Sequence, residues 1–322
     1  MNNTNSKQNI TGIHHITAIA GNARKNMDFY SGILGLRFIK KTVNFDDPGT
    51  YHFYYGDDMG NPGSVLTFFP YPGSRQGRHG IGQVNTATFS VPIDAIEYWE
   101  NRFKKFDINY KDAQERMGSE VFIYFEDPDG LGLELVFNEK DDRKPASHGH
   151  IPEEYAIRGF YSAEIWARGY ERTGGLLATQ MDHKLIAERG NRFRFAAVNS
   201  PGNYIDILVP ASNIPGLSGA GTVHHIAFRT ADRESQLEVM QKVRRAGIRP
   251  SPIMDRQYFQ SIYFREPGDV LFEVATDGPG FTIDEHLDEL GNALKLPPQY
   301  ESRREQIEKM LPEVSISLKD FL

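Results

Sequence analysis

The sequence predicts an α+β fold of four βαβββ modules that form two cups of mixed β-sheet. A short strand-like run recurs about once in every quarter of the 322-residue chain, and a helix-like segment and further strand-like runs follow each copy. Adjacent histidines occur in the first and the last of these runs, at opposite ends of the chain. This repetition indicates that the two end modules share one site.

Four apolar strand-like runs open the modules. In chain order they read GIHHITAI from Gly12, QVNTATFSV from Gln83, GFYSAEIWA from Gly159 and TVHHIAFRT from Thr222. Residues 22–34, 92–106 and 232–247 then show the spacing of amphipathic helices, whereas the third module has only the weaker segment 169–179. Each module closes with another strand, namely SVLTFFP, GLGLELVF, NYIDILVP and DVLFEVAT. Turns rich in Pro and Gly, EDPDGLG and REPGDV, lead into the second and fourth of these.

Three regions follow from this order. Residues 1–147 hold modules one and two, and residues 153–279 hold modules three and four. Residues 280–322 are expected to form a C-terminal loop and helix tail that could close over a cup. The segment from His148 to Pro152, after the charged DDRKP, is expected to link the two pairs of modules.

The composition limits the class of protein. The net charge is −7 and no basic cluster is interleaved with aromatic residues, which argues against a nucleic-acid partner and favours a small molecule. No apolar run is long enough for a membrane span, and the first residues lack the apolar core of a signal peptide, so we expect a cytoplasmic protein without a membrane partner. Because the chain has no cysteine, any metal must be held by nitrogen and oxygen.

Two aligned columns of the repeat contain candidate metal ligands. The first strands align His14-His15 with His224-His225, and the last strands align four further residues: Thr67, Glu134, Asp206 and Glu273. Side chains alternate between the two faces of a strand, and the second histidine of each doublet takes the more polar face. We therefore predict His15, His225 and Glu273 as the metal ligands.

Two neutral imidazoles and one carboxylate suit one kind of metal centre. They occupy one face of an octahedral iron(II) ion and leave three positions open for a chelating substrate and dioxygen. Manganese or zinc could occupy the same ligands. Glu134 and Asp206 have no histidine beside them and are expected to be solvated or hydrogen-bonded carboxylates. We assign no role to the remaining histidines, which are His52, His79, His148, His150, His183 and His286.

The positions of the three ligands in the chain constrain the architecture. His15 belongs to module one, whereas His225 and Glu273 belong to module four, so these two modules must face each other in a shared cup. Modules two and three then form a second cup without a metal. This explains why Asn85-Thr86 and Tyr161-Ser162 stand where the end modules have histidine.

This organisation, with histidine on a first strand and glutamate on a last strand, resembles the vicinal oxygen chelate superfamily of glyoxalases, bleomycin and fosfomycin resistance proteins and extradiol dioxygenases. The resemblance runs from Gly12 to the Pro-rich tail and is closest to the hydroquinone ring-cleaving dioxygenases. It is carried by GIHHITAIAGNARKNMDFYSGILGLRFIKKTVNFDD, TVHHIAFRT and DRQYFQSIYFREPGDVLFEVATDGPGF. The block around FQSIYFREPG is the most specific part.

The resemblance implies an Fe(II)-dependent dioxygenase that inserts O2 into the ring of a hydroquinone, a para-diphenol. It makes His15, His225 and Glu273 the iron ligands, and it places a second set of residues around the diphenol and dioxygen: His14, Thr17, His224, Arg256 and Tyr263. Strand alternation turns His14 and His224 away from the metal, so these two residues need a β-bulge or an edge position to reach it.

Two other activities fit the same residues. A catechol extradiol dioxygenase uses the same ligand set, and only substrate assays separate it from a hydroquinone enzyme. A glyoxalase-like, metal-dependent isomerase or lyase usually has a second carboxylate in its metal set, and Thr67 at the matching position argues against it. The expected partners are a small aromatic diphenol and O2, and a homo-oligomer is left open.

Overall fold

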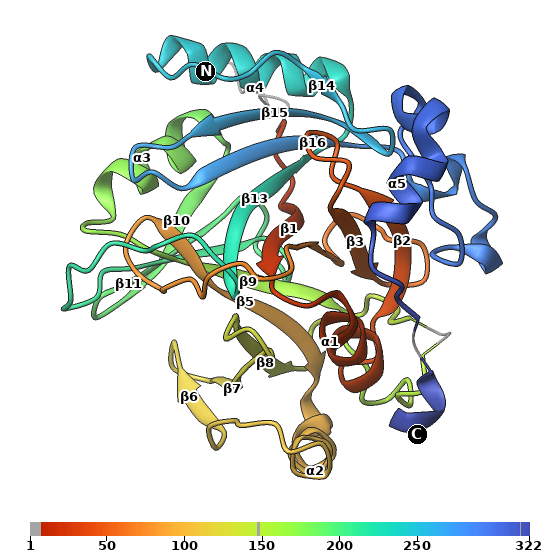
Figure 1. The fold of residues 1–322 in the computed structure, drawn as a ribbon. Coiled ribbons are helices and arrows are strands. Elements are labelled where there is room, and N and C mark those ends of the chain that lie inside the picture. Colours follow the sequence, from red (N-terminus) through yellow and green to blue (C-terminus); the bar gives the residue numbers. More distant parts are fainter. Residues whose placement is uncertain (1–7, 147–148, 316) are drawn as a thin grey trace.

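Two curled, eight-stranded mixed sheets make up the computed structural model, which describes residues 8–146, 149–315 and 317–322 (Figure 1). The predicted α+β fold with two mixed-sheet cups is confirmed. Residue 147, where the first predicted region ends, and His148 of the predicted linker lie outside the described residues.

The first sheet combines the two ends of the chain. Its strand order is β14-β15-β16-β13-β1-β4-β3-β2, so modules one and four share it and meet where β1 pairs antiparallel with β13. The sequence-based expectation that the end modules share a cup is therefore confirmed. The strands are β1 Ile13–Ala20, β2 Arg37–Val43, β3 Tyr51–Gly56, β4 Val65–Pro70, β13 Thr222–Thr230, β14 Met254–Asp255, β15 Phe259–Arg265 and β16 Leu271–Pro279.

The second sheet repeats this topology with the two middle modules. Its order is β10-β11-β12-β9-β5-β8-β7-β6, and β5 pairs antiparallel with β9 at its centre. The strands are β5 Gln83–Pro92, β6 Gln114–Arg116, β7 Glu120–Glu126, β8 Gly132–Asn138, β9 Gly159–Trp166, β10 Lys184–Arg189, β11 Arg192–Ala196 and β12 Tyr204–Leu208.

The helices follow the first strand of each module. They are α1 Ala23–Met27, α2 Ile96–Lys105, α3 Glu171–Gln180 and α4 Arg233–Arg245, with α5 Arg304–Met310 in the tail. The weak helical segment of the third module is thus a helix. The helix predicted over residues 22–34 instead divides into α1 and a π-helical turn, Asp28–Ile33. Arg102 of α2 donates to the carbonyls of Gly32 and Ile33, at 2.8 and 2.7 Å, and so pairs two carbonyls at the end of this turn.

Helix α4 covers one face of the first sheet and leaves the other face for the cup. Its Val239 and Val243 are buried, and its Gln236 Nε2 donates to the carbonyl of Val274 on β16 at 2.9 Å. Because successive side chains on a strand point to opposite faces, Glu273 next to Val274 points into the cup.

Two β-bulges interrupt the central β1-β13 pair, one at each histidine doublet. Ile13 pairs with Phe228 and His15 with Ala227, so His14 is the extra residue on β1. Thr17 pairs with His225 and Ala18 with Val223, so His224 is the extra residue on β13. A bulge turns two successive side chains toward similar directions, which simple alternation forbids. The structure therefore has the bulges that the sequence analysis required.

The C-terminal tail packs beside β2 and β3 of the first sheet (Figure 1). It begins with short 3-10 turns, Phe281–Ile283 and Leu287–Glu289, and continues through a third, Pro298–Arg303, into α5. Lys40 of β2 is fully buried and bonds Asp284 and Glu285 of the tail. Within the described ranges, no helix is long and apolar enough to cross a membrane.

Candidate metal centre and substrate cavity

Three buried side chains from three strands converge at the centre of the first sheet. His15 of β1, His225 of β13 and Glu273 of β16 each offer one ligand atom, and these atoms lie within 4.8 Å of one another. The two Nε2 atoms are 3.3 Å apart, and the Oε2 atom of Glu273 lies 3.3 Å from His15 Nε2 and 2.9 Å from His225 Nε2. The structure thus brings together the three predicted ligands.

These separations fit a shared cation. Metal–ligand bonds of about 2.1 Å at right angles put adjacent donor atoms about 3.0 Å apart, whereas tetrahedral angles put them about 3.4 Å apart. The three observed separations, 2.9, 3.3 and 3.3 Å, are close to the values for either geometry. In addition, Oε2 of Glu273 is buried and has no hydrogen-bond donor among the described residues. A buried carboxylate oxygen is costly in that state, and a cation would satisfy it.

The hydrogen bonds behind His15 determine which of its nitrogens carries a proton. His14 Nε2 lies 3.1 Å from the carbonyl of Thr276, which can only accept, so this nitrogen carries the hydrogen. Burial, together with neighbouring His15, lowers the pKa of His14 to about 3, so the ring is neutral and its Nδ1 accepts. His15 Nδ1, 2.9 Å away, is then the donor. His15 Nε2 is left with a lone pair directed at Glu273 and His225.

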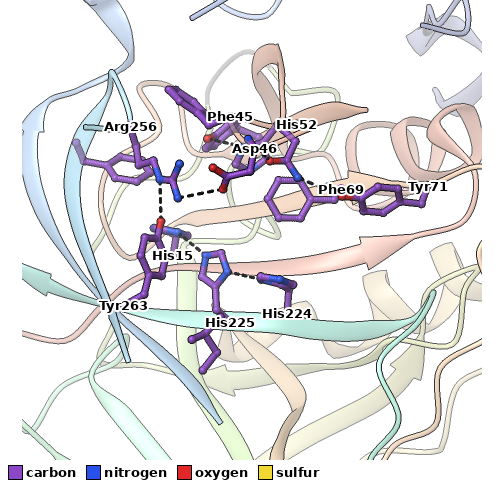
Figure 2. Close-up of a pocket in the computed structure, with 14 residues that line it drawn as sticks. His15, Phe45, Asp46, His52, Phe69, Tyr71, His224, His225, Arg256 and Tyr263 are labelled. Atoms are coloured by element: carbon purple, nitrogen blue, oxygen red, sulfur yellow. Dashed lines mark hydrogen bonds and ion pairs between the residues drawn. The ribbon is translucent and has the colours of Figure 1, made fainter. Parts of the chain in front are cut away.

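The second doublet repeats the close contact between the two Nδ1 atoms. His224 Nδ1 lies 2.8 Å from His225 Nδ1 (Figure 2), and burial lowers the pKa of His225, which keeps that ring neutral. Burial opposes ionisation of Glu273, and a cation held beside Oε2 would favour its carboxylate form. Ser261 Oγ donates to the other carboxylate oxygen, Oε1, which orients the group.

A cavity of about 340 Å³ opens above the centre, at the lower end of the range for small-molecule sites. Phe45, Phe69 and Phe259 contribute aromatic walls, and His15 and His225 lie at its floor (Figure 2). Of the residues predicted around the substrate, His224, Arg256 and Tyr263 line this cavity. The arrangement suits a flat, largely apolar molecule with a polar group directed at the floor.

The remaining two predicted residues, His14 and Thr17, are buried behind the floor and are not among the residues lining the cavity. Thr17 Oγ1 lies 2.7 Å from Thr67 Oγ1, which in turn lies 2.9 Å from His52 Nε2. Tyr54 OH completes the chain, 2.9 Å from His52 Nδ1.

Arg256 and Tyr263 form the polar wall of the cavity. Arg256 Nε donates to Tyr263 OH at 3.2 Å, and the guanidinium lies over the rings of Phe45 and Tyr263, 5.5 and 5.2 Å from their centroids. Burial, reinforced by Glu273, raises the pKa of Tyr263 well above its usual range. The phenol therefore stays protonated, and its own hydrogen can be donated to a ligand oxygen.

The lining residues that sequence reasoning missed include two polar ones of interest, His52 on β3 and Asp46 in the loop that precedes it. Neither lies in an aligned column of the repeat. For His52 a signal existed, because it is the one polar side chain in the aromatic run YHFYY. For Asp46 no signal was present, since an acidic residue in a loop is ordinary.

Thr67 occupies the position related to Glu273 by the internal repeat. On β1 and β4, Thr17 pairs with Thr67, and Thr17 lies two residues after His15. On β13 and β16, Ala227 pairs with Glu273, and Ala227 lies two residues after His225. The fourth corner of a symmetric centre thus carries a hydroxyl instead of a carboxylate, which leaves three strong ligands.

The second cup contains arginines where the first has its ligands. Glu134 accepts from Thr88 Oγ1 at 2.8 Å and from Arg116 Nη1 at 2.8 Å, and Asp206 accepts from Arg192 and Arg194. The prediction that these two carboxylates are hydrogen-bonded is confirmed. Guanidinium groups compensate the buried negative charge there, so the cup needs no metal.

Comparisons with known proteins agree with this fold and site. The model of the glyoxalase/bleomycin resistance protein/dioxygenase superfamily matches residues 12–135 and 131–274. The chain belongs to this superfamily, as its resemblance to vicinal oxygen chelate proteins predicted.

Individual relatives narrow the comparison. The chain is 46% identical over 301 residues, 93% of its length and 95% of the relative's, to a Bacillus subtilis protein named "Putative ring-cleaving dioxygenase MhqO". It is 32% identical over 308 residues, 93% and 95% of the two lengths, to chlorohydroquinone/hydroquinone 1,2-dioxygenase of Sphingobium indicum. A solved structure titled as a "putative dioxygenase" from Bacillus subtilis superposes with a TM-score of 0.92, at 43% identity, over 96% of this chain and 99% of that one.

These relatives confirm the prediction that the chain is an enzyme of the dioxygenase kind, and they imply a metal cofactor. The identity of the metal and of the ring that is opened belongs to the proposal below.

Proposed function

We propose that this protein is an Fe(II)-dependent dioxygenase that opens a hydroquinone-type ring with both atoms of O2. The observation that carries the proposal is the convergence of two imidazole Nε2 atoms and one carboxylate oxygen at the floor of an aromatic cavity. The relatives named ring-cleaving dioxygenases, one of them for hydroquinones, support the choice of substrate.

Iron(II) is the proposed metal because the centre has two histidines and one carboxylate and has no second carboxylate among the described residues. Two histidines and one carboxylate on one face are the ligand set of non-haem Fe(II) oxygenases, which need open positions. Thr67 at the fourth corner is hydrogen-bonded to Thr17 and His52 and adds no carboxylate. When bound by His15, His225 and Glu273, a ferrous ion supplies electron transfer between the ring and dioxygen.

The cavity residues have separate proposed tasks. The aromatic walls hold the ring and exclude water, and Arg256 lies beside the position of a diphenol oxygen that faces away from the floor. Tyr263, kept protonated, donates its hydroxyl hydrogen to an oxygen of the bound substrate. His224 reaches the cavity, and burial lowers its pKa to about 3, so its neutral ring serves as a hydrogen-bond partner for a hydroxyl of the diphenol.

His14 and Thr17 are proposed as positioning residues. His14 accepts the Nδ1 hydrogen of His15 and so keeps the Nε2 lone pair available for the metal. Thr17, which faces Thr67 at 2.7 Å, holds the polar side of the cup in place without touching the cavity.

Metal content and oxygen uptake test the proposal. Protein purified without oxygen should retain iron, and methylhydroquinone should cause oxygen uptake with loss of the aromatic absorbance. Faster uptake with catechols than with hydroquinones would instead indicate an extradiol enzyme. Zinc-loaded protein that consumes no oxygen with any diphenol would indicate the isomerase or lyase activity and would contradict the proposal.

A further inference from the structure

One ion pair at the mouth of the cavity contains the permanently charged side chains of the described cavity lining. Arg256 Nη2 lies 3.4 Å from Asp46 Oδ2 (Figure 2). Among the described residues that line the cavity, Arg256 is the only one that is always cationic and Asp46 is the only aspartate or glutamate. No other lining residue among the described ones is Lys, Arg, Asp or Glu, so the permanent charges of the cavity wall cancel.

The two partners differ in exposure. The side chain of Arg256 is 15% exposed, whereas that of Asp46 is 73% exposed and lies at the solvent side of the mouth. An incoming molecule therefore passes the carboxylate before it reaches the guanidinium. Arg256 already has a counter-ion in Asp46 and donates Nε to Tyr263 OH, so a second carboxylate would have to share a cation whose charge is already paired.

The loop that carries Asp46 is held in place from several sides. Asn44 Oδ1 accepts from the backbone N–H of Asp46 at 2.9 Å, and Asn44 Nδ2 donates to Tyr71 OH at 3.2 Å. Tyr300 of the tail donates its hydroxyl to the carbonyl of Phe45 at 2.8 Å. The carboxylate is thus positioned at the mouth by bonds from the strand side and from the tail.

We propose that Asp46 is a specificity-determining residue, which reserves the cavity for diphenols with uncharged ring substituents and rejects diphenols that carry a carboxylate. This inference rests on the proposed function, since it names the substrate class of the same site. A phenol or a singly ionised diphenol brings at most one negative charge, which the metal centre compensates. A carboxylate on the ring adds a second negative charge. Asp46 repels this charge, and the described lining residues offer no unpaired cation to compensate it.

Two para-diphenols of similar ring size test the proposal, methylhydroquinone and 2,5-dihydroxybenzoate. Their dissociation constants are measured without oxygen on the iron-loaded protein by calorimetric titration. Wild type should bind the carboxylated ligand at least about tenfold more weakly. In Asp46→Asn the carboxylated ligand should bind more tightly, so that the ratio of the two dissociation constants falls about tenfold. This fall should be larger at low salt than at high salt. Asp112→Asn, which removes the same charge from an exposed residue outside the cavity lining, should leave the ratio unchanged.

A ratio in Asp46→Asn equal to that of wild type would overturn the proposal, and so would equal affinity of wild type for both ligands. Oxygen uptake with methylhydroquinone is recorded separately on the same preparations. If no diphenol is oxidised but the affinity ratio shifts as expected, the proposed reaction fails while the selectivity of the site stands. If the diphenol is oxidised and the ratio does not shift, only the role of Asp46 fails.

Discussion

His14 and His15 are neighbours in the chain, but only His15 offers a lone pair to the centre. The carbonyl of Thr276 fixes the proton on His14 Nε2, and the proton on His15 Nδ1 follows. Such outer partners commonly change metal affinity by about 10–100-fold when they are removed. We therefore expect His14 to affect metal affinity although it does not line the cavity.

His14→Phe tests this role. The ring cannot accept the Nδ1 hydrogen of His15, so the preferred tautomer is lost and iron affinity should fall about 10–100-fold. Competition with a metal-binding dye measures the change, and thermal unfolding without metal checks that the fold survives. His286→Gln, an exposed histidine outside the site, should bind iron as wild type does. Unchanged affinity in His14→Phe would show that the tautomer is fixed by other means.

His183 gives the stability a dependence on pH. It is buried against Phe228, its Nδ1 lies 2.5 Å from the carbonyl of Met181, and burial lowers its pKa to about 4. The unfolded chain takes up the proton near pH 6.5, whereas the folded chain does not until about pH 4. The stabilisation is thus complete above pH 6.5 and is lost as the pH falls toward 4, by about 3 kcal/mol at most.

Denaturant unfolding of wild type and His183→Gln at pH 7.5 and pH 4.5 measures this contribution. The free energy of unfolding should fall less between the two pH values in the variant, because the group that titrates is gone. The comparison between the two proteins cancels the titration of all other residues. Equal losses in both would contradict the assignment.

For single residues, the internal repeat predicted the candidate metal ligands but not the contacts of the other cavity residues. His15, His225 and Glu273 were recognisable because their positions recur in register. The pairing of Asp46 with Arg256 joins residues 210 positions apart through a loop, and no periodic signal records such a contact. The same is true of His52, whose partners Thr67 and Tyr54 are set by the register of β3 and β4.

The elements themselves followed the sequence pattern except where their regularity breaks. The strands that open and close each module and the helices α2, α3 and α4 could be predicted from apolar spacing. The π-helical turn after α1 and the bulges at His14 and His224 could not be placed from spacing. Each depends on contacts with a distant segment, α2 for the turn and the opposite strand for the bulges.

Two ion pairs of the buried Lys40 connect β2 to the tail. Lys40 bonds Asp284 and Glu285, and Lys40→Met leaves both carboxylates without their cation. Removing one partner of a buried pair costs about 3–5 kcal/mol, so the free energy of unfolding should fall by about that amount. Amide hydrogen exchange should rise mainly in the tail.

The triple variant Lys40→Met, Asp284→Asn, Glu285→Gln provides the control. It removes the unpaired charges together with the cation, so it should recover part of the lost stability. If the single variant is as stable as wild type, the other contacts of the tail, such as the hydrogen bonds of Tyr51 and Tyr300, are enough to hold it.

In the whole molecule, a metal would tie β1, near the start of the chain, to β13 and β16, near its end. A ligand that binds only the folded state adds about 2.7 kcal/mol of stability at a concentration one hundred times its dissociation constant. Iron should therefore raise the midpoint of thermal unfolding by about 5 °C, and a chelator should reverse the rise. Glu273→Gln, which keeps the shape of the side chain, should respond to neither treatment, and an equal shift in this variant would place the metal elsewhere.

The order of strands in the two sheets also has a consequence for biosynthesis. All strands of the second sheet lie between residues 83 and 208, whereas the first sheet needs both β1 and β16, which ends at Pro279. During synthesis the second sheet can form before β13 to β16, the remaining strands of the first sheet, have been made. A premature stop before Leu271 would remove β16 and with it Glu273, so the three predicted metal ligands are all present only after most of the chain has been made.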